Sequence, residues 1–194
     1  MMQPRNLLLS FLVATALLRV QGALAAEPAG TRQGPTGVGL SLEIDPVPFM
    51  AGGYSVGLGW RLDHLRLSVH AYAADVPSAV VPHGFDARIR YGLAIRGQLY
   101  LEGGARGWFA GAELGPTSLR YTRSGTAGAA RVDHLSFTPT AGYRWFPWGG
   151  GLYLMPAAGV EMPLVSRGDS TLGGEPLPSR RATPLAAFHV GWEI

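Results

Sequence analysis

The chain has 194 residues, of which 47% are hydrophobic and only 15% are charged, with a formal net charge of +3. Its length favours a single domain, and its apolar content excludes an intrinsically disordered chain, which would be poorer in apolar residues and richer in net charge. The absence of cysteine from the sequence excludes disulfides, thiol chemistry and cysteine-based metal sites.

The first residues have the pattern of a secretory signal peptide. Arg5 supplies a positive charge, residues 7–18 form an apolar run, and Ala23-Leu24-Ala25 is a small-x-small cleavage site. We expect residues 1–25 to be cleaved as a signal peptide and residues 26–36, rich in Gly, Pro and Thr, to form a short periplasmic tail. Two arginines leave with the signal peptide, so the mature chain is nearly neutral and its charge gives no reason to expect binding to nucleic acid.

From residue 37 to residue 194, apolar residues alternate with polar or small ones in segments bounded by turn residues, which is the pattern of β-strands. No uncharged apolar run in this part reaches the ~18 residues of a membrane-spanning helix. In the fifth strand we expect Pro116 to mark a β-bulge, after which Leu119 and Tyr121 take over the apolar face. The pattern predicts eight strands, over residues 37–45, 53–62, 65–73, 87–101, 107–121, 134–145, 152–164 and 184–194.

Strand length and loop length both indicate a membrane. In the predicted hairpin over residues 134–164, each limb is about twelve residues long and keeps one apolar face, whereas a soluble strand usually has ~5–6 residues and a tilted transmembrane strand ~9–11. The connections after the second, fourth and sixth strands are short, and those after the first, third, fifth and seventh are long. Small outer-membrane barrels show this asymmetry between periplasmic turns and extracellular loops.

The aromatic residues support the same interpretation. Tyr54, Phe85 and Tyr121 fall near the long loops. Aromatic belts form at both rims of the apolar band of a membrane barrel, so we expect the tryptophans to mark the periplasmic rim. All five tryptophans fall at the short-turn ends of the predicted strands: Trp60, Trp108, Trp145, Trp148 and Trp192.

Residues 37–194 therefore resemble the small outer-membrane barrels of the OmpX and OmpA transmembrane-domain type. Phe188, Val190 and Trp192 resemble the C-terminal signal that the assembly machinery of such barrels reads, although the chain ends in Ile194 instead of the usual Phe. The resemblance implies an all-β, eight-stranded antiparallel up-and-down transmembrane barrel in the outer membrane of a Gram-negative bacterium. It also implies a monomer whose partners are outer-membrane lipids, lipopolysaccharide and the assembly machinery.

The polar face of the predicted strands would point into the barrel. Because an eight-stranded barrel is filled by side chains, we expect this face to form a packed network of Arg–Glu pairs, with a narrow, anion-favouring ion path as the alternative. Arg120 and His134 lie on the same face in this phasing. The principal members of the predicted lumen network are Glu43, Arg61, Arg66, His70, Arg88, Arg90, Arg96, Glu113, Arg144, Glu161, His189 and Glu193.

A metal site and a catalytic site are the alternatives to this structural role. His70, His134 and His189 have no short His-x-His or His–Glu spacing, so polar filling of the lumen is favoured over a metal site, and no cofactor is expected. His134-Leu135-Ser136 resembles the His-x-Ser of outer-membrane lipid A deacylases, in which the His activates the Ser hydroxyl. The phasing, however, turns both side chains away from lipid.

The sequence thus predicts a non-enzymatic outer-membrane barrel with a structural or surface-interaction role. One alternative is a lipid-A-modifying enzyme built on His134 and Ser136. The other is a soluble secreted barrel that binds a small apolar ligand in the manner of lipocalins, which would put apolar residues inside and polar residues outside.

Overall fold

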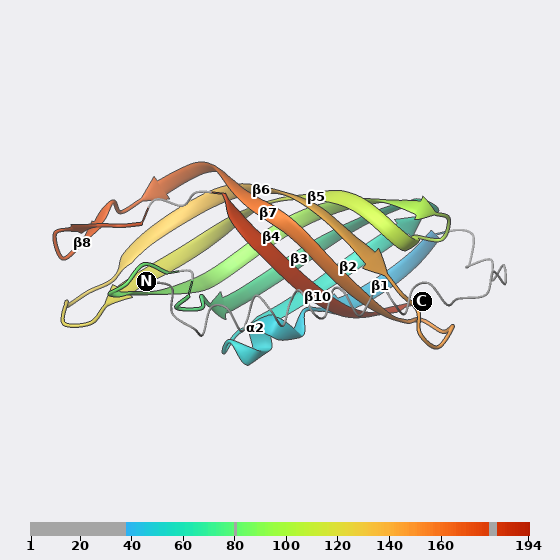
Figure 1. Cartoon of the computed structure of the whole chain (residues 1–194), viewed down its shortest axis with the longest axis horizontal. Helices are drawn as coiled ribbons and strands as arrows, with labels where there is room; N and C mark the ends of the chain where they lie inside the picture. The colour runs from blue at the N-terminus through green and yellow to red at the C-terminus, as the bar shows by residue number, and fades with distance from the viewer. Residues whose placement is uncertain (1–37, 80, 179–181) are drawn as a thin grey trace, which may run out of the picture. The chain divides into compact units, whose positions relative to one another are not determined.

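A computed structural model of the protein describes residues 38–79, 81–178 and 182–194, and within them eight strands close into an antiparallel barrel (Figure 1). Each strand pairs with its neighbour in sequence, and β1 pairs with β10 to close the ring. This confirms the predicted fold class, whereas the predicted signal peptide and tail lie outside the described residues. The strands of the barrel are β1 (Val38–Ile44), β2 (Tyr54–Leu62), β3 (Leu65–Asp75), β4 (Phe85–Glu102), β5 (Arg106–Arg123), β6 (Ala130–Arg144), β7 (Leu152–Gly168) and β10 (Thr183–Glu193).

The connections gather at two ends of the barrel, which we call the turn end and the loop end. The turn end holds residues 63–64, 103–105 and 145–151, and the described residues of the loop end are 45–53, 76–79, 81–84, 124–129, 169–178 and 182. Because β3, β4, β5 and β6 extend further than predicted, the loops after β3 and after β5 are shorter than the sequence suggested.

Two small elements lie in the loops. The proline-containing segment after β1 forms a short helix, α2 (Pro46–Met50), capped by Asp45, whose side chain accepts a hydrogen bond of 2.9 Å from the Val47 backbone. The last loop contains a two-stranded hairpin of β8 (Thr171–Leu172) and β9 (Glu175–Pro176). Among the described residues, no helix is long and apolar enough to cross a membrane.

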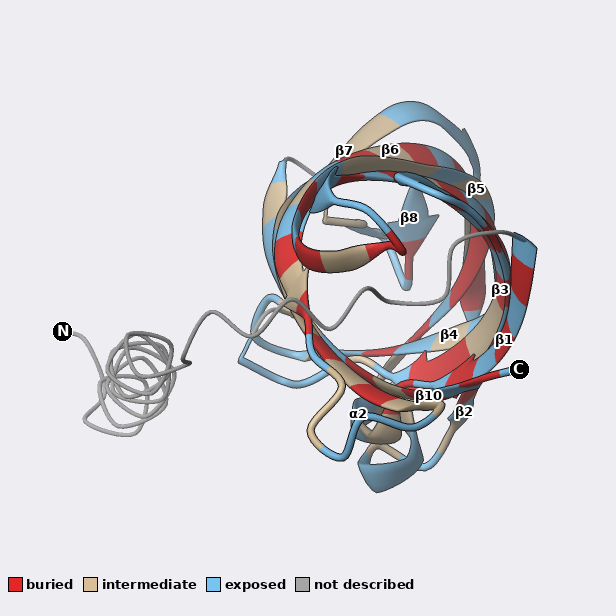
Figure 2. Cartoon of the chain, turned by 90° about the vertical axis from the view of Figure 1, so that its right-hand side faces the viewer, coloured by how far each residue is buried: buried red, intermediate tan, exposed pale blue. Residues whose placement is uncertain are grey.

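Polar residues face the inside of the barrel and apolar residues the outside over the half that adjoins the turn end. In β1, Ser41 and Glu43 are buried while Leu40 and Leu42 are exposed, and β2 alternates in the same way. Figure 2, which looks into the barrel, shows the buried and exposed residues alternating along the strands. A soluble barrel has the opposite polarity, because water favours a polar exterior.

At a β-bulge in β4, the set of residues that points into the barrel changes from even-numbered to odd-numbered positions. The β4–β5 register shifts between Ile89 and Tyr91, so that Gly92 and Ala94 are buried on one side of the bulge and Ala87 on the other. The prediction of a bulge at Pro116 is wrong: β5 pairs with β6 without a shift from Gly107 to Tyr121. The extra residue belongs to β4, where it is Arg90.

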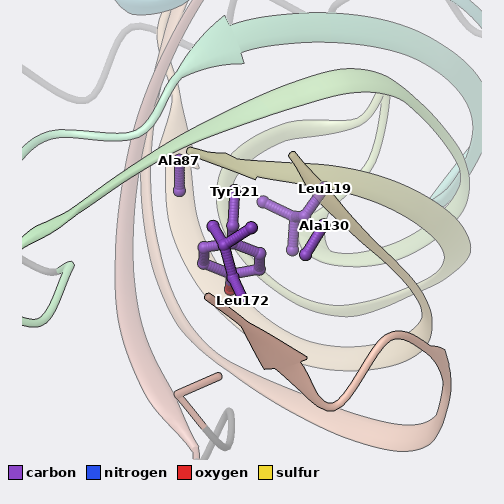
Figure 3. Packing of buried hydrophobic residues seen from close by; sticks show 5 residues of the cluster. All are labelled: Ala87, Leu119, Tyr121, Ala130 and Leu172. Carbon is purple, nitrogen blue, oxygen red and sulfur yellow. The ribbon is translucent and has the colours of Figure 1, made fainter. Parts of the chain in front are cut away.

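Beyond this bulge the inside of the barrel is apolar. Leu119 and Tyr121 continue the inward face of β5 and are almost fully buried, so the prediction that they join the outer apolar face is wrong. Leu172 of the β8–β9 hairpin packs with them. Figure 3 shows this apolar cluster, which consists of Ala87, Leu119, Tyr121, Ala130 and Leu172.

Candidate functional site in the barrel lumen

Glu43 is the centre of the polar lumen. Its carboxylate, 1% exposed, accepts hydrogen bonds of 2.9 Å from Arg66 Nη2 and 2.7 Å from the Tyr153 hydroxyl, both at Oε2. Its other oxygen, Oε1, lies 2.9 Å from His70 Nε2 and 3.8 Å from Arg96 Nη1. A buried carboxylate is stable only when it is paired and hydrogen-bonded, and these four groups, from β3, β4 and β7, provide that compensation.

Arg66 is held from several sides of the barrel. It is fully buried, and besides Glu43 it donates hydrogen bonds of 2.9 Å to Gln98 Oε1, 3.0 Å to Ser41 Oγ and 3.2 Å to the Tyr153 hydroxyl. The guanidinium suits this role because its donors form a planar fork that can satisfy several acceptors. The Glu43–Arg66 pair therefore joins β1, β3, β4 and β7 across the lumen.

A second charge pair lies beside the first. Arg96 donates from Nε and Nη2 to Glu113 Oε2, at 3.0 and 2.8 Å, and from Nη1 to His189 Nε2 at 3.0 Å. A cavity of about 10 Å³ adjoins these three residues, which is about the space of one water molecule. At this level the lumen is filled by side chains.

A third cluster closes the lumen toward the turn end. Glu193 of β10 binds Arg61 Nε through Oε1 and Arg144 Nη2 through Oε2, both at 2.7 Å. The Arg144 guanidinium also lies 3.8 Å from the centroid of the Tyr153 ring, and its Nη1 donates to the Ala105 carbonyl at 3.1 Å. Because Tyr153 contacts Arg144, Arg66 and Glu43, its side chain connects the first and third clusters.

Inward glycines make room for these large side chains. A Cβ added to Gly57 would lie 2.5 Å from His70 Cε1, and one added to Gly39 would lie 2.8 Å from Arg61 Nη2. At Gly191 an added Cβ would overlap the Tyr153 ring. Alternating glycine and long polar side chains thus fill the narrow interior, as expected for a small barrel.

Glu43, His70 and His189 bring donor atoms within 4.8 Å of one another, although they are distant in sequence. The sequence has no short His–Glu spacing, but closure of the barrel brings Glu43 of β1 to His70 of β3. Arg96 donates to His189 Nε2 and lies near Glu43 Oε1, so a metal ion would have to displace a guanidinium. The surroundings favour a hydrogen-bonded network over a metal centre.

His134 and Ser136 lie in the lumen nearer the loop end and are buried. Ser136 Oγ donates to Glu161 Oε1 at 2.9 Å, and His134 Nδ1 lies 2.7 Å from Ser166 Oγ, so each is paired with β7. Both side chains point away from the outer surface. The Ser136 hydroxyl is therefore enclosed in the lumen.

Most predicted network residues are enclosed, but the arginines near the β4 bulge are not. Arg88, Arg90 and Arg120 are exposed on the outer wall, and Arg88 pairs with Asp75 at 3.3 Å. Their prediction as lumen residues is wrong because the bulge at Arg90 reverses the face of β4, and because β5 keeps even-numbered residues such as Arg120 outside. Glu161 is half-buried in the lumen beside Ser136, nearer the loop end.

The structure adds network members that the sequence reasoning overlooked. Tyr153, Gln98 and Tyr100 are 0–2% exposed, and the Tyr100 hydroxyl donates to Gln98 Oε1 at 3.3 Å. Their positions on the inward face of the strands could have identified them as network members, but the prediction considered mainly charged side chains.

The tryptophans lie on the outside near the turn end. Trp192 is opposite Leu42 on β1 and Trp60 is opposite Leu40, while Trp145 and Trp148 belong to the turn between β6 and β7. Each of the five is between 38% and 71% exposed. Of the aromatic residues predicted for the opposite rim, Tyr54 is exposed, but Tyr121 is buried in the apolar cluster.

Comparison with known proteins supports the fold alone. No family model matches the sequence, and no curated protein matches it. A solved structure, the N-terminal β-barrel domain of Pseudomonas aeruginosa OprF, is similar with a TM-score of 0.50 at 12% sequence identity. The alignment covers 84% of this chain and 100% of that one. The chain thus shares a small β-barrel fold with this domain, and the likeness does not single out OmpX.

Proposed function

We propose that this chain is a non-enzymatic outer-membrane β-barrel protein of a Gram-negative bacterium, with a structural or surface-interaction role. The observation that carries the proposal is the polarity of the barrel between the turn end and the β4 bulge. There the outer face is apolar, with Ile95 and Leu99 more than 60% exposed, while Glu43 and Arg66 are buried inside. Lipid stabilises such an exterior and water does not.

Closure of the sheet supports a position in lipid. The first and last strands pair over four residues, Ser41 to Ile44 of β1 with Val190 to Glu193 of β10, and the backbone of Ile194 bonds that of Leu40 in both directions. Where this ladder closes the ring, the backbone groups of the first and last strands bond to each other, which is required in a hydrocarbon environment. The exposed tryptophans near the turn end suit one interface of that environment.

The filled lumen supports a structural role over transport. Charge pairs centred on Glu43, Glu113 and Glu193 occupy successive levels of the interior. Such a network holds the strands together, and a water-filled channel would require a wider barrel.

The two alternatives receive less support. A lipocalin-like barrel would enclose an apolar ligand, but the interior between the turn end and the bulge is charged. A lipid-A-modifying enzyme would need its nucleophile at the lipid-facing surface, but Ser136 is 6% exposed and bonds Glu161 inside the barrel. We expect mass spectrometry of lipid A to give the same profile for wild type and Ser136→Ala. A lipid A modification that is present with the wild-type protein and lost with Ser136→Ala would establish the enzyme.

The location is tested by fractionation and gel migration. We expect the protein in the outer-membrane fraction, and we expect unheated samples to migrate differently from boiled ones in detergent gels, because small barrels stay folded without heating. Recovery of the chain as a soluble periplasmic protein would refute the proposal.

Orientation is tested with single cysteines, since the chain has none of its own. We expect Glu175→Cys, at the loop end, to react with a membrane-impermeant maleimide in intact cells. Gly150→Cys, at the turn end, is a matched exposed position where an added Cβ has open space. It should react only after the outer membrane is permeabilised, and the reverse pattern would invert the proposed orientation.

A further inference from the structure

Three arginines stand side by side on the outer wall near the loop end. Arg88 of β4 is directly opposite Arg120 of β5, and Arg120 is directly opposite Arg131 of β6. The row ends at Asp75 of β3 and at Asp169, whose side chain accepts a hydrogen bond from the Arg131 backbone. Like charges in directly opposed positions destabilise a sheet, so a row of three requires a compensating partner.

Two more arginines extend the row toward the apolar face. Arg90 is the bulge residue of β4, and Arg167 of β7 is opposite Asp133 of β6. We call the five the outer arginine patch, and all are exposed: Arg88, Arg90, Arg120, Arg131 and Arg167.

The acidic residues of the protein do not neutralise the patch. Arg88 pairs with Asp75 at 3.3 Å, and Arg131 pairs with Asp133 at 3.0 Å. Within the described part of the chain, no carboxylate forms an ion pair with Arg90, Arg120 or Arg167. The patch therefore presents three exposed guanidinium groups that form no ion pair with the described residues.

Part of the patch is held in place before any partner binds. Arg131 donates from Nε to Ser118 Oγ at 3.1 Å and from Nη2 to the Tyr91 hydroxyl at 3.0 Å. These contacts span β4, β5 and β6 and hold one guanidinium against the wall. A charged group that is already positioned loses less conformational entropy on binding.

The position of the patch relative to the apolar face selects the partner. Along the same strands in the direction of the turn end, the outer wall becomes apolar, with Leu93, Leu114, Leu135 and Val165 all exposed. If the apolar face lies in the membrane, the patch lies at the depth of the lipid head groups on the loop side. A partner there must be anionic and attached to the lipid.

We propose that the outer arginine patch binds the phosphate groups of an anionic glycolipid in the leaflet on the loop side. This inference rests on the proposed location in the outer membrane. Guanidinium forks match phosphate oxygens with two parallel hydrogen bonds, and such charge-assisted bonds are stronger than neutral ones. A phosphate bound at Arg120, the middle residue of the row, would also relieve the repulsion between Arg120 and its neighbours Arg88 and Arg131.

The test compares two lipid probes on the folded, full chain in detergent micelles, with native mass spectrometry as the readout. The probes are bisphosphorylated lipid A and the same lipid after removal of both phosphates. We expect wild type to retain the bisphosphorylated form at least about tenfold more strongly. The triple variant R90Q/R120Q/R167Q should lose this preference, since each arginine near an anionic surface contributes roughly a fivefold gain in affinity.

Matched variants separate the patch from general charge. R123Q removes an arginine at the loop end that pairs with Glu175 and lies outside the patch, so it should keep the wild-type preference. R120Q alone should lose part of the preference for bisphosphorylated lipid A, so it still tests the inference if the triple variant does not fold. Folding is checked by heat-modifiable gel migration.

Equal retention of the two lipids by folded wild type, or unchanged preference in folded R90Q/R120Q/R167Q, would overturn the inference. Neither result would affect the proposed location, because fractionation measures that separately. Conversely, a soluble periplasmic protein that still preferred bisphosphorylated lipid A would refute the location while leaving a phosphate-binding patch.

Discussion

The half of the barrel next to the turn end and the half next to the loop end are built with opposite polarity. In the turn half, Glu43 and Arg66 fill the inside and Leu99 is exposed outside. In the loop half, Leu119 and Tyr121 fill the inside, while the outside carries the outer arginine patch. The same strands thus serve two solvents. The change of polarity occurs at the β4 bulge, which would be the edge of the membrane at the proposed location.

The two halves also differ in what holds them together. In the turn half, hydrogen bonds and charge pairs between inward side chains join non-adjacent strands across the lumen, beside a buried apolar cluster of Tyr100, Ala105, Phe109, Tyr153 and Met155. In the loop half, burial of apolar side chains from β4, β5, β6 and the β8–β9 hairpin performs this role, as in a soluble protein. The comparison predicts that substitutions of one kind have different effects in the two halves.

The largest effect is expected for Glu43→Ala in the turn half. Removal of this carboxylate leaves Arg66, which is fully buried, with its charge uncompensated. Breaking a buried pair in this way costs about 3–5 kcal/mol. We expect the free energy of unfolding, measured by urea titration in lipid vesicles, to fall by this amount.

The control is Glu175→Ala in the loop half, which removes the partner of Arg123. That pair is 3.7 Å apart and its Glu175 side chain is 57% exposed, so its loss should change the unfolding free energy by less than about 1 kcal/mol. Equal effects of the two substitutions would contradict the central role of Glu43.

The second prediction concerns the outer face. Ile95 lies on the apolar exterior of β4 and is 65% exposed, so Ile95→Arg would place a charge in lipid at a cost of about 2–4 kcal/mol. Asp86→Arg is the matched change on the exposed wall of the same strand beyond the bulge. We expect it to have little effect in the same vesicle titration. A small effect at Ile95 would show that this face is in water.

The sequence predicted the turn half well because its alternation is uninterrupted. β1 and β2 keep apolar and polar residues on separate faces, with Gly57 and Gly59 on the polar face and Trp60 on the apolar face. The barrel, its filled lumen and the turn-end tryptophans could therefore be inferred. Which inward residues meet could not. Glu43 and Arg66 meet because of the stagger of the closed sheet, which depends on all eight strands together.

The loop half was mispredicted because its bulge leaves no trace in the pattern. Ile89 and Tyr91 are both apolar and two residues apart, which reads as one continuous face, yet Ile89 packs against the apolar cluster and Tyr91 is exposed. Pro116 looked like the irregular residue, but it sits outward in a regular ladder opposite Leu135. Apolar Leu119 was assigned to lipid because the assignment assumed one solvent for the whole strand.

The smallest and most local effect is expected for Leu172→Ala. Leu172 is 7% exposed and connects the β8–β9 hairpin to the apolar cluster, so its truncation should weaken the attachment of this hairpin by about 2 kcal/mol. Proteolysis that depends on local opening should then cleave residues 169–178 about 30-fold faster than in wild type.

Global unfolding in vesicles should not change with Leu172→Ala, because the hairpin makes no ladder with the barrel strands among the described residues. Leu177→Ala provides a comparison within the same loop, since Leu177 is only partly buried against the cluster and should accelerate cleavage less. If Leu172→Ala instead lowered the global stability as much as Glu43→Ala, the two halves would unfold as one unit. The two halves would then face different environments but would depend on each other for stability.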